Sequence, residues 1–327
     1  MRKPSTLLAM TLLLAACASP QPPAGGASTP VPVAAAPEAS ASQASGAVAT
    51  AGAAPSAAPT SAAAVAPAAT PGPASCGALG CLLFDTPVQA FSRVLESSPR
   101  VLAVGESHAQ QGNEGVASAT KRFTESFLPL LSGKASDLIV ELWAVDPSCN
   151  KQKVAKVQEE QKAVTQSQAQ GNQSEFVTLG HEAKRLGVVP DILRPSCAEY
   201  DAILKAGQGS IDQMLEMIAR LTAAKAKALL ARESMAGKMV VAYGGALHND
   251  LAPGPGRERW SFGPELQAHT GGKYVELDII VREFIKDTDS WKALPWYAHF
   301  KRDENPDKAI LFNPAPGSYV LIFPRSS

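Results

Sequence analysis

The sequence predicts an α/β domain in which a mainly parallel β-sheet is flanked by helices, and in which a disordered linker precedes this single domain. Two observations support this fold class. Short runs that are apolar on both faces recur between residues 100 and 323, as in the central strands of a parallel sheet. Stretches with helical spacing of apolar residues lie between them, and this alternation favours parallel strands joined by right-handed crossovers.

The first sixteen residues have the layout of a secretory signal peptide. Arg2 and Lys3 precede a short apolar stretch over residues 7–16, which is too short to cross a bilayer. The stretch ends in "LAAC", which resembles a bacterial lipobox with Cys17 as the lipid-bearing residue. We therefore predict a lipid-anchored protein of the bacterial cell envelope, in our interpretation at the outer membrane. The alternative is an ordinary cleavage site followed by a chance cysteine.

Residues 17–75 are predicted to form the lipidated cysteine and a disordered linker. This segment consists almost entirely of Ala, Pro, Ser, Thr and Gly, with Glu38 as its only charged residue. It lacks the large apolar side chains that a core needs, and its recurring prolines argue against a helical stalk. Residues 76–327 contain no further linker and no internal repeat, so they are predicted to form one domain.

The charge balance excludes one class of partner. Loss of the signal peptide removes Arg2 and Lys3 from the 30 basic residues, which leaves 28 against 30 acidic ones. A protein that binds nucleic acid usually presents a basic face, so no nucleic-acid partner is predicted. The predicted partners are the membrane, through the lipid anchor, and a small-molecule or peptide substrate or haem.

The predicted strands cover residues 100–105, 137–143, 188–193, 238–244, 274–281 and 318–323. Helices are predicted over residues 114–131, over the polar stretch 151–186, which we interpret as a surface arm, and after a capping box formed by Ser210 and Gln213.

In sheets of this kind, ligands bind beyond the carboxyl ends of the strands. This rule selects Glu106 and His108 after the first predicted strand, Glu141 near the end of the second and His248 after the fourth. Asp191, near the end of the third strand, either reaches this site or caps the following turn.

The four cysteines that follow Cys17 form an even set in a compartment that permits disulfides. Three pairings exist. We favour Cys76 with Cys81 and Cys149 with Cys197, because the last two lie in loops beyond the ends of the second and third strands. Four free buried thiols are the alternative.

Ser107 is the centre of Gly105-Glu106-Ser107-His108-Ala109, which approximates the nucleophile elbow of serine hydrolases. That elbow normally follows several earlier strands, whereas this is the first predicted strand. The pattern Gly-x-x-His is more informative, because it occurs twice, from Gly105 to His108 and from Gly245 to His248, in a chain with five histidines. We therefore favour the histidines over the serine.

The segments "VLAVGESHAQ", "LIVELW" and "VVAYGGALHND" resemble the core motifs of the superfamily that contains erythromycin esterase, the ChaN haem-binding lipoproteins and the Tiki/TraB proteins. The enzymes of this superfamily are hydrolases, of which some depend on a metal and others use His and Glu to activate water. The ChaN-like members are surface lipoproteins that hold haem. By motif, the resemblance implies site roles for Glu106, His108, Glu141 and His248, with His108 as the cofactor ligand if haem binds.

Two chemistries suit these residues. His108, Glu141 and His248 would hold Zn²⁺, Mn²⁺, Fe²⁺ or Co²⁺, with Glu106 as base or fourth ligand. Without a metal, one histidine would be the general base and a carboxylate would orient it.

The leading hypothesis is a hydrolase of ester or amide bonds. The runner-up is an uptake lipoprotein that binds haem or a metal without turnover. The remaining hypotheses are a structural module with a decayed site, and histidines that merely bond the backbone.

Overall fold

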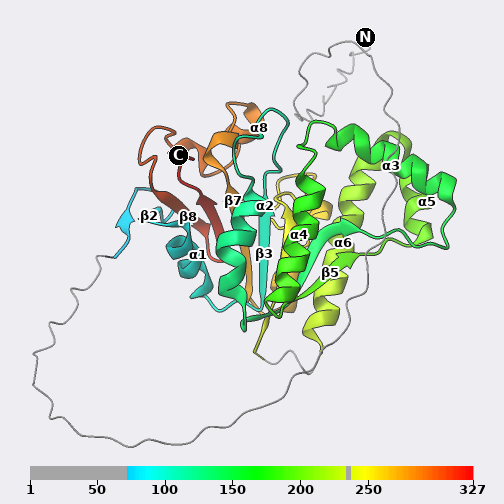
Figure 1. The fold of residues 1–327 in the computed structure, drawn as a ribbon, viewed down its shortest axis with the longest axis horizontal. Helices are drawn as coiled ribbons and strands as arrows, with labels where there is room; N and C mark the ends of the chain where they lie inside the picture. Colours follow the sequence, from blue (N-terminus) through cyan, green and yellow to red (C-terminus); the bar gives the residue numbers. More distant parts are fainter. Residues whose placement is uncertain (1–71, 233–236, 327) are drawn as a thin grey trace, which may run out of the picture. The chain divides into compact units, whose positions relative to one another are not determined.

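A nine-stranded sheet in the order β1-β2-β8-β9-β7-β3-β6-β4-β5 forms the centre of the part that the structure describes (Figure 1). The computed structural model describes residues 72–232 and 237–326. The predicted signal peptide, the lipidation site Cys17 and the predicted linker up to residue 71 lie outside the described residues. Within the described residues, no helix is both long and apolar enough to cross a bilayer.

Six neighbouring strands of the sheet run parallel. They are β9 (Ser318–Ile322), β7 (Tyr274–Ile280), β3 (Val101–Glu106), β6 (Met239–Gly245), β4 (Ala135–Trp143) and β5 (Val189–Leu193). The antiparallel part consists of β8 (Ala309–Ala315), β2 (Leu82–Phe84) and β1 (Ala74–Ser75). The parallel strands are the six predicted ones, and their ends lie within two residues of the predictions, so the α/β fold class is confirmed.

The register at the centre brings the carboxyl ends of three strands level. Glu106, the last residue of β3, lies beside Gly245 of β6 on one side and Ile279 of β7 on the other. All six residues of β3 are buried. Loops that leave β3, β6 and β7 therefore start at one edge of the sheet, as the ligand rule for parallel sheets requires.

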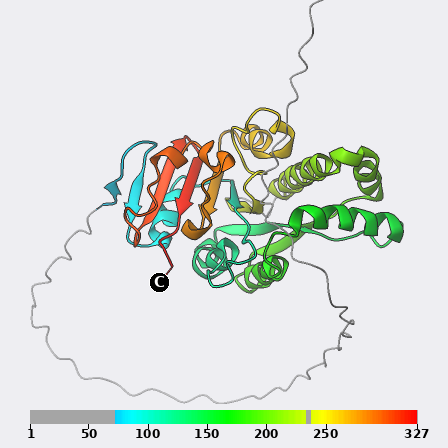
Figure 2. The ribbon, with the colours of Figure 1, turned by 90° about the horizontal axis from the view of Figure 1, so that it is seen from above.

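Helices cover both faces of the sheet, and Figure 2 shows α2 and α4 on the opposite side from α6 and α7. The first face carries α1 (Pro87–Leu95), α2 (Ala119–Arg122), the π-helical turn η1 (Phe123–Phe127), the 3₁₀ turn η2 (Leu128–Leu131) and α4 (Asn172–Arg185). The second face carries α3 (Lys151–Thr165), α5 (Cys197–Ala206), α6 (Ser210–Leu230) and α7 (Gly263–His269). The shorter helices are η3 (Gly207–Gly209), η5 (Glu258–Trp260), η6 (Arg282–Phe284), α8 (Asp289–Lys292) and η7 (Tyr297–His299).

The core is divided by the sheet. On the first face, Phe91 stacks on Phe127 with ring centroids 4.4 Å apart, and Phe123 meets both rings edge to face. On the second face, one apolar cluster lies under α6, and a separate cluster forms around Trp296 over β8 and β9. These last two clusters leave between them a strip of β7 that is polar.

Three helix predictions differ from the structure. The helix predicted over residues 114–131 begins only at Ala119, because the Ser118 side chain caps it by accepting from the Lys121 N–H. The polar stretch over residues 151–186 forms two helices, and α4 buries Phe176 and Leu179 in the core, so it is not a surface arm. The capping box at Ser210 is absent, since Ser210 is the first residue of α6, Gly209 is its N-cap, and the Ser210 hydroxyl donates to Glu160.

The structure contains both predicted disulfides, Cys76–Cys81 and Cys149–Cys197, with Cα atoms 5.0 and 5.2 Å apart. Cys149 lies in the loop after β4, and Cys197 is the first residue of α5. The second bond therefore ties together the two ends of a segment that contains α3, α4 and β5, at the edge of the sheet where the site residues lie.

The two disulfides are expected to contribute unequally to stability. The Cys149–Cys197 bond spans 48 residues and the Cys76–Cys81 bond spans 5. Loop-closure entropy then gives losses of about 4 and about 2 kcal/mol for the paired alanine variants, Cys149→Ala with Cys197→Ala and Cys76→Ala with Cys81→Ala. Urea unfolding of the two double variants and the parent measures the difference. Equal losses would contradict this account.

Candidate functional site

The four predicted site residues lie together at the carboxyl edge of the central strands. Glu106 ends β3, and His108 follows it by two residues. Glu141 lies near the end of β4, and His248 lies in the loop after β6. Glu106 and His248 are buried, whereas His108 and Glu141 are partly exposed. The carboxyl-end rule therefore found residues that the fold does bring together.

Glu106 is the most heavily hydrogen-bonded member of the site. Its side chain is 2 % exposed, and its Oε1 lies 2.8 Å from His108 Nδ1. Its Oε2 accepts from the hydroxyls of Thr120 and Tyr243, each at 2.8 Å. A buried carboxylate is stable only when such donors replace water. The bond to Nδ1 fixes the His108 ring and turns Nε2 away from Glu106.

His108 Nε2 borders Gly245. A Cβ atom added to Gly245 would lie 3.3 Å from this nitrogen and 3.8 Å from Glu141 Oε2. The ring also packs edge to face on Phe176 of α4, with centroids 5.9 Å apart. The imidazole is thus held by Glu106 and Phe176, with its second nitrogen at the strand end that Glu141 also reaches.

Glu141 and His248 form the other half of the site. Glu141 Oε2 accepts from the Gly245 N–H at 2.8 Å, and its Oε1 lies 3.7 Å from His248 Nε2. His248 Nδ1 donates to the Trp260 carbonyl at 2.8 Å, since a carbonyl can only accept. His248 Nε2 is therefore the nitrogen directed toward Glu141.

This arrangement requires glycine at position 244. A Cβ atom there would overlap Glu141 Oε2 and would lie 2.9 Å from Glu141 Cβ. Only a residue without a side chain lets the Glu141 carboxylate cross β6 and reach the Gly245 N–H.

Charge and burial perturb two groups of the site. Burial alone would lower the pKa of His108, but the hydrogen bond to Glu106 and the negative charges of Glu106 and Glu141 raise that pKa above its ordinary value. Burial, reinforced by the charge of Glu106, raises the pKa of Tyr243 well above its usual range. Tyr243 thus keeps its proton and remains a donor to Glu106.

The predicted metal ligands do not converge on one position. Within the described residues, two groups of three side chains place their ligand atoms within 4.8 Å of one another, and His108, Glu141 and His248 are not such a group. Both histidines have Nδ1 bonded to a protein oxygen, which leaves Nε2 as the ring nitrogen that a metal would use. The poor fit to one transition metal therefore rests on the distances between the ligand atoms alone.

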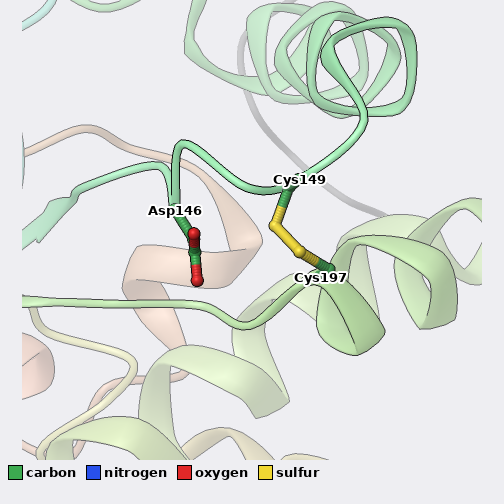
Figure 3. A group of neighbouring side chains, drawn as sticks. All are labelled: Asp146, Cys149 and Cys197. Carbon is green, nitrogen blue, oxygen red and sulfur yellow. A yellow bond between two sulfur atoms is a disulfide. The ribbon is translucent and has the colours of Figure 1, made fainter.

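One of the two groups is Asp146, Cys149 and Cys197, shown in Figure 3. The two sulfurs are bonded to each other, so neither is a thiolate that could bind a metal. Asp146 instead accepts from the backbone N–H and the hydroxyl of Ser148, and these bonds lower its pKa. This group is a turn next to the disulfide.

The second group, Asp250, Glu276 and Asp278, was not found by sequence reasoning. Burial, together with the neighbouring carboxylate Asp250, raises the pKa of Glu276 to about 7, and burial with the charge of Glu276 raises the pKa of Asp278 well above its usual value. The alternation of acids in "YVELDII" was the signal that could have indicated it.

Sequence reasoning also missed Thr120 and Tyr243, which bind Glu106.

Ser107 lies in a loop, and the next helix after β3 in the described residues is α2, which begins at Ala119. The strand-turn-helix of a nucleophile elbow is therefore not formed at Ser107. Asp191 does not join the site, since its side chain pairs with Lys225 at 2.9 Å.

A small cavity of about 10 Å³ adjoins the second half of the site, and its lining includes Glu141, Gly244, Gly245 and His248. A volume of this order holds about one water molecule. The neighbouring walls are apolar and come from Ile139, Ala242 and Phe262.

Comparisons with known proteins add little. No family model matches the sequence, and no curated protein matches it. Among solved structures, the chain is similar to the type III effector HopBA1, with 13% identity over 74% of this chain and 94% of that one and a TM-score of 0.35.

The pKa of His108 is expected to lie above 6.5, its ordinary value. A histidine that binds its proton more tightly when folded adds stability that is fully present below the unfolded pKa and is lost as the pH rises through the folded pKa. The stability advantage of the parent over His108→Asn should therefore be larger at about pH 5.5 than at about pH 8.5. NMR titration of His108, with Glu106→Gln expected to lower its pKa, measures the cause directly. An unchanged pKa in Glu106→Gln would refute it.

Gly244→Ala is expected to displace the Glu141 carboxylate, because the added methyl group occupies its place. Overpacking and the lost hydrogen bond to Gly245 should together cost about 1–3 kcal/mol in the free energy of unfolding. Gly115→Ala is the control, because an added Cβ at Gly115 meets no atom within 4 Å. Gly112 is not suitable, because its positive φ would strain any other residue. Urea unfolding should show a much smaller effect for Gly115→Ala.

Proposed function

We propose that this domain hydrolyses an ester or amide bond by means of a water molecule that the Glu106–His108 pair activates, without a metal at the His108, Glu141 and His248 cluster. One observation carries the proposal: Glu106 is buried and holds His108 Nδ1, while His108 Nε2 faces the strand end where Glu141 and His248 also meet. A carboxylate that orients a histidine general base is a recurring arrangement in hydrolases.

In this mechanism, His108 Nε2 removes a proton from water as the water oxygen attacks the carbonyl carbon of the substrate. The imidazolium that forms is stabilised by Glu106, whose two oxygens are fixed by Thr120, Tyr243 and His108. The proton then passes to the alcohol or amine as the carbon–oxygen or carbon–nitrogen bond breaks. The raised pKa of His108 strengthens it as a base, which is useful when the pH lies above that pKa.

Glu141 and His248 have the geometry to position the substrate. Glu141 is fixed by the Gly245 N–H, and His248 is fixed by the Trp260 carbonyl. His248 Nε2, the ring nitrogen opposite the one that donates to Trp260, is directed toward Glu141 and would border a substrate bound between them. The adjoining cavity, which is large enough for about one water, borders Glu141 and His248 and not His108.

The resemblance of the three motifs to the erythromycin esterase, ChaN and Tiki/TraB superfamily supports the same proposal, since hydrolases occur there. The proposal includes a lipid anchor at Cys17 and a linker that holds the catalytic domain away from the membrane. The haem-binding alternative is kept as an outcome of the experiment below.

The test is hydrolysis of a panel of p-nitrophenyl esters and p-nitroanilides of increasing acyl length. His108→Ala and Glu106→Gln should each lower kcat/KM by about 10²-fold or more, because each removes the general base or its orientation. Glu141→Gln and His248→Ala should also lower it. His181→Ala is the matched control, since His181 is an exposed residue of α4. The rate should fall as the pH drops through the pKa of His108.

Two results would contradict the proposal. If kcat/KM is unchanged in His108→Ala, then this histidine is not the base. If the purified active protein contains one equivalent of a transition metal that is lost in His108→Ala, a metal at the histidine cluster is required after all. Added haem that gives a Soret shift in the parent but not in His108→Ala, in a protein without hydrolytic activity, would favour the haem-binding alternative.

A further inference from the structure

A second polar cluster lies next to Asn249, the residue that follows His248 of the site described above. Glu276 and Asp278 are alternate residues of β7 and therefore face the same side of the sheet. Asp250 reaches them from the loop that follows β6, and the ligand oxygens of the three carboxylates lie within 4.8 Å of one another. The cluster occupies the strip between the two apolar clusters of the second face.

The hydrogen bonds within this cluster do not cancel its charge. Glu276 is 7 % exposed, and it accepts from the Leu251 N–H at 2.7 Å and the Ser318 hydroxyl at 3.1 Å. Asp278 accepts from the Asn249 amide nitrogen at 3.0 Å. All three donors are neutral, so the ionised carboxylates would repel one another in a poorly solvated place; burial, together with this repulsion, raises the pKa of both Glu276 and Asp278.

Asn249 gives an independent indication of a ligand. It is 1 % exposed, and within the described residues its Oδ1 has no hydrogen-bond partner. A buried amide oxygen without a partner costs about 1–3 kcal/mol, so its persistence needs an explanation. In the orientation present, the amide nitrogen donates to Asp278, which leaves Oδ1 as the atom without a partner.

The free oxygen of Asn249 faces the same small space as Asp278. A Cβ atom added to Gly105 would lie 2.6 Å from Asn249 Oδ1 and 2.7 Å from Asp278 Oδ1. The two oxygens therefore both pack against Gly105 of β3, where any side chain would displace them. The unpartnered amide oxygen thus lies near a carboxylate oxygen of the acidic cluster, and these two atom types are a suitable pair of ligands for a cation.

We propose that Asp250, Glu276, Asp278 and the side-chain oxygen of Asn249 bind one hard divalent cation of the Mg²⁺, Ca²⁺ or Mn²⁺ class. An all-oxygen set with three carboxylates suits these ions and disfavours those that prefer sulfur or imidazole. The cation would offset the repulsion between the carboxylates and satisfy the amide oxygen. Because residues 248–250 are consecutive, it would also fix the loop that carries His248. This site is separate from His108 and stands whether or not the domain is a hydrolase.

The experiment is calorimetric titration of the full protein with MgCl₂, CaCl₂ and MnCl₂ after treatment with EDTA, together with the shift in Tm that each ion causes. One equivalent should bind to the parent with Kd at or below about 1 mM for at least one ion, and that ion should raise Tm. Asp278→Asn and Glu276→Gln should each weaken binding by about tenfold or more. Both variants are near-isosteric and reduce repulsion, so they should fold, and circular dichroism of each variant checks this.

Asp146→Asn and His108→Ala are the controls. Asp146 belongs to the group beside the disulfide, and His108 belongs to the Glu106 pair, so both variants should bind the ion as the parent does. Three results would overturn the proposal: no binding by any of the three ions at about 1 mM, binding that survives both Asp278→Asn and Glu276→Gln, or binding that is lost in His108→Ala. The last result would locate the ion in the histidine cluster.

Discussion

The Glu106 carboxylate joins three parts of the fold that are remote in sequence. Its oxygens bind His108 from the loop after β3, Thr120 from the start of α2 and Tyr243 from β6. Because the carboxylate is buried, these donors replace water, and loss of one leaves a buried charged group with fewer hydrogen bonds, which is costly. The position of α2 over the first face of the sheet and the orientation of His108 therefore depend on the same group.

Glycines at the ends of β3 and β6 make both polar clusters sterically possible. Gly105 lies beside Gly244 on one side and Asp278 on the other in the register of the sheet. Without side chains at these positions, Glu141 can cross β6 and Asn249 can approach β3. Two groups of acids can then lie at the same edge, on either side of the loop that contains His248 and Asn249.

The six parallel strands could be predicted because residues buried on both faces form continuous apolar runs, as in "RVLAVG" and "KMVVAYG". β1 has two residues and β2 only three, Leu-Leu-Phe, so neither run is long enough to be recognised as a strand. The apolar run of β8 is interrupted by Asn-Pro-Ala at its end. His108 and His248 could be predicted because Gly-x-x-His follows a strand twice. Thr120 and Tyr243 could not, because their role depends on how α2 and β6 pack laterally against β3. Tyr243 in sequence is one more apolar residue of a buried run.

The loop after β6 relates the two polar clusters to each other. His248 faces Glu141, Asn249 donates to Asp278, and Asp250 completes the acidic group, so three consecutive side chains are shared between two sites. Tyr274 and Ser261 hold the same segment, since their hydroxyls donate to the carbonyls of Asn249 and of His248 and Asp250. Residues 248–250 are thus already held in place by several hydrogen bonds. A cation bound to the acidic group would hold this segment more firmly, and it would therefore keep His248 close to Glu141.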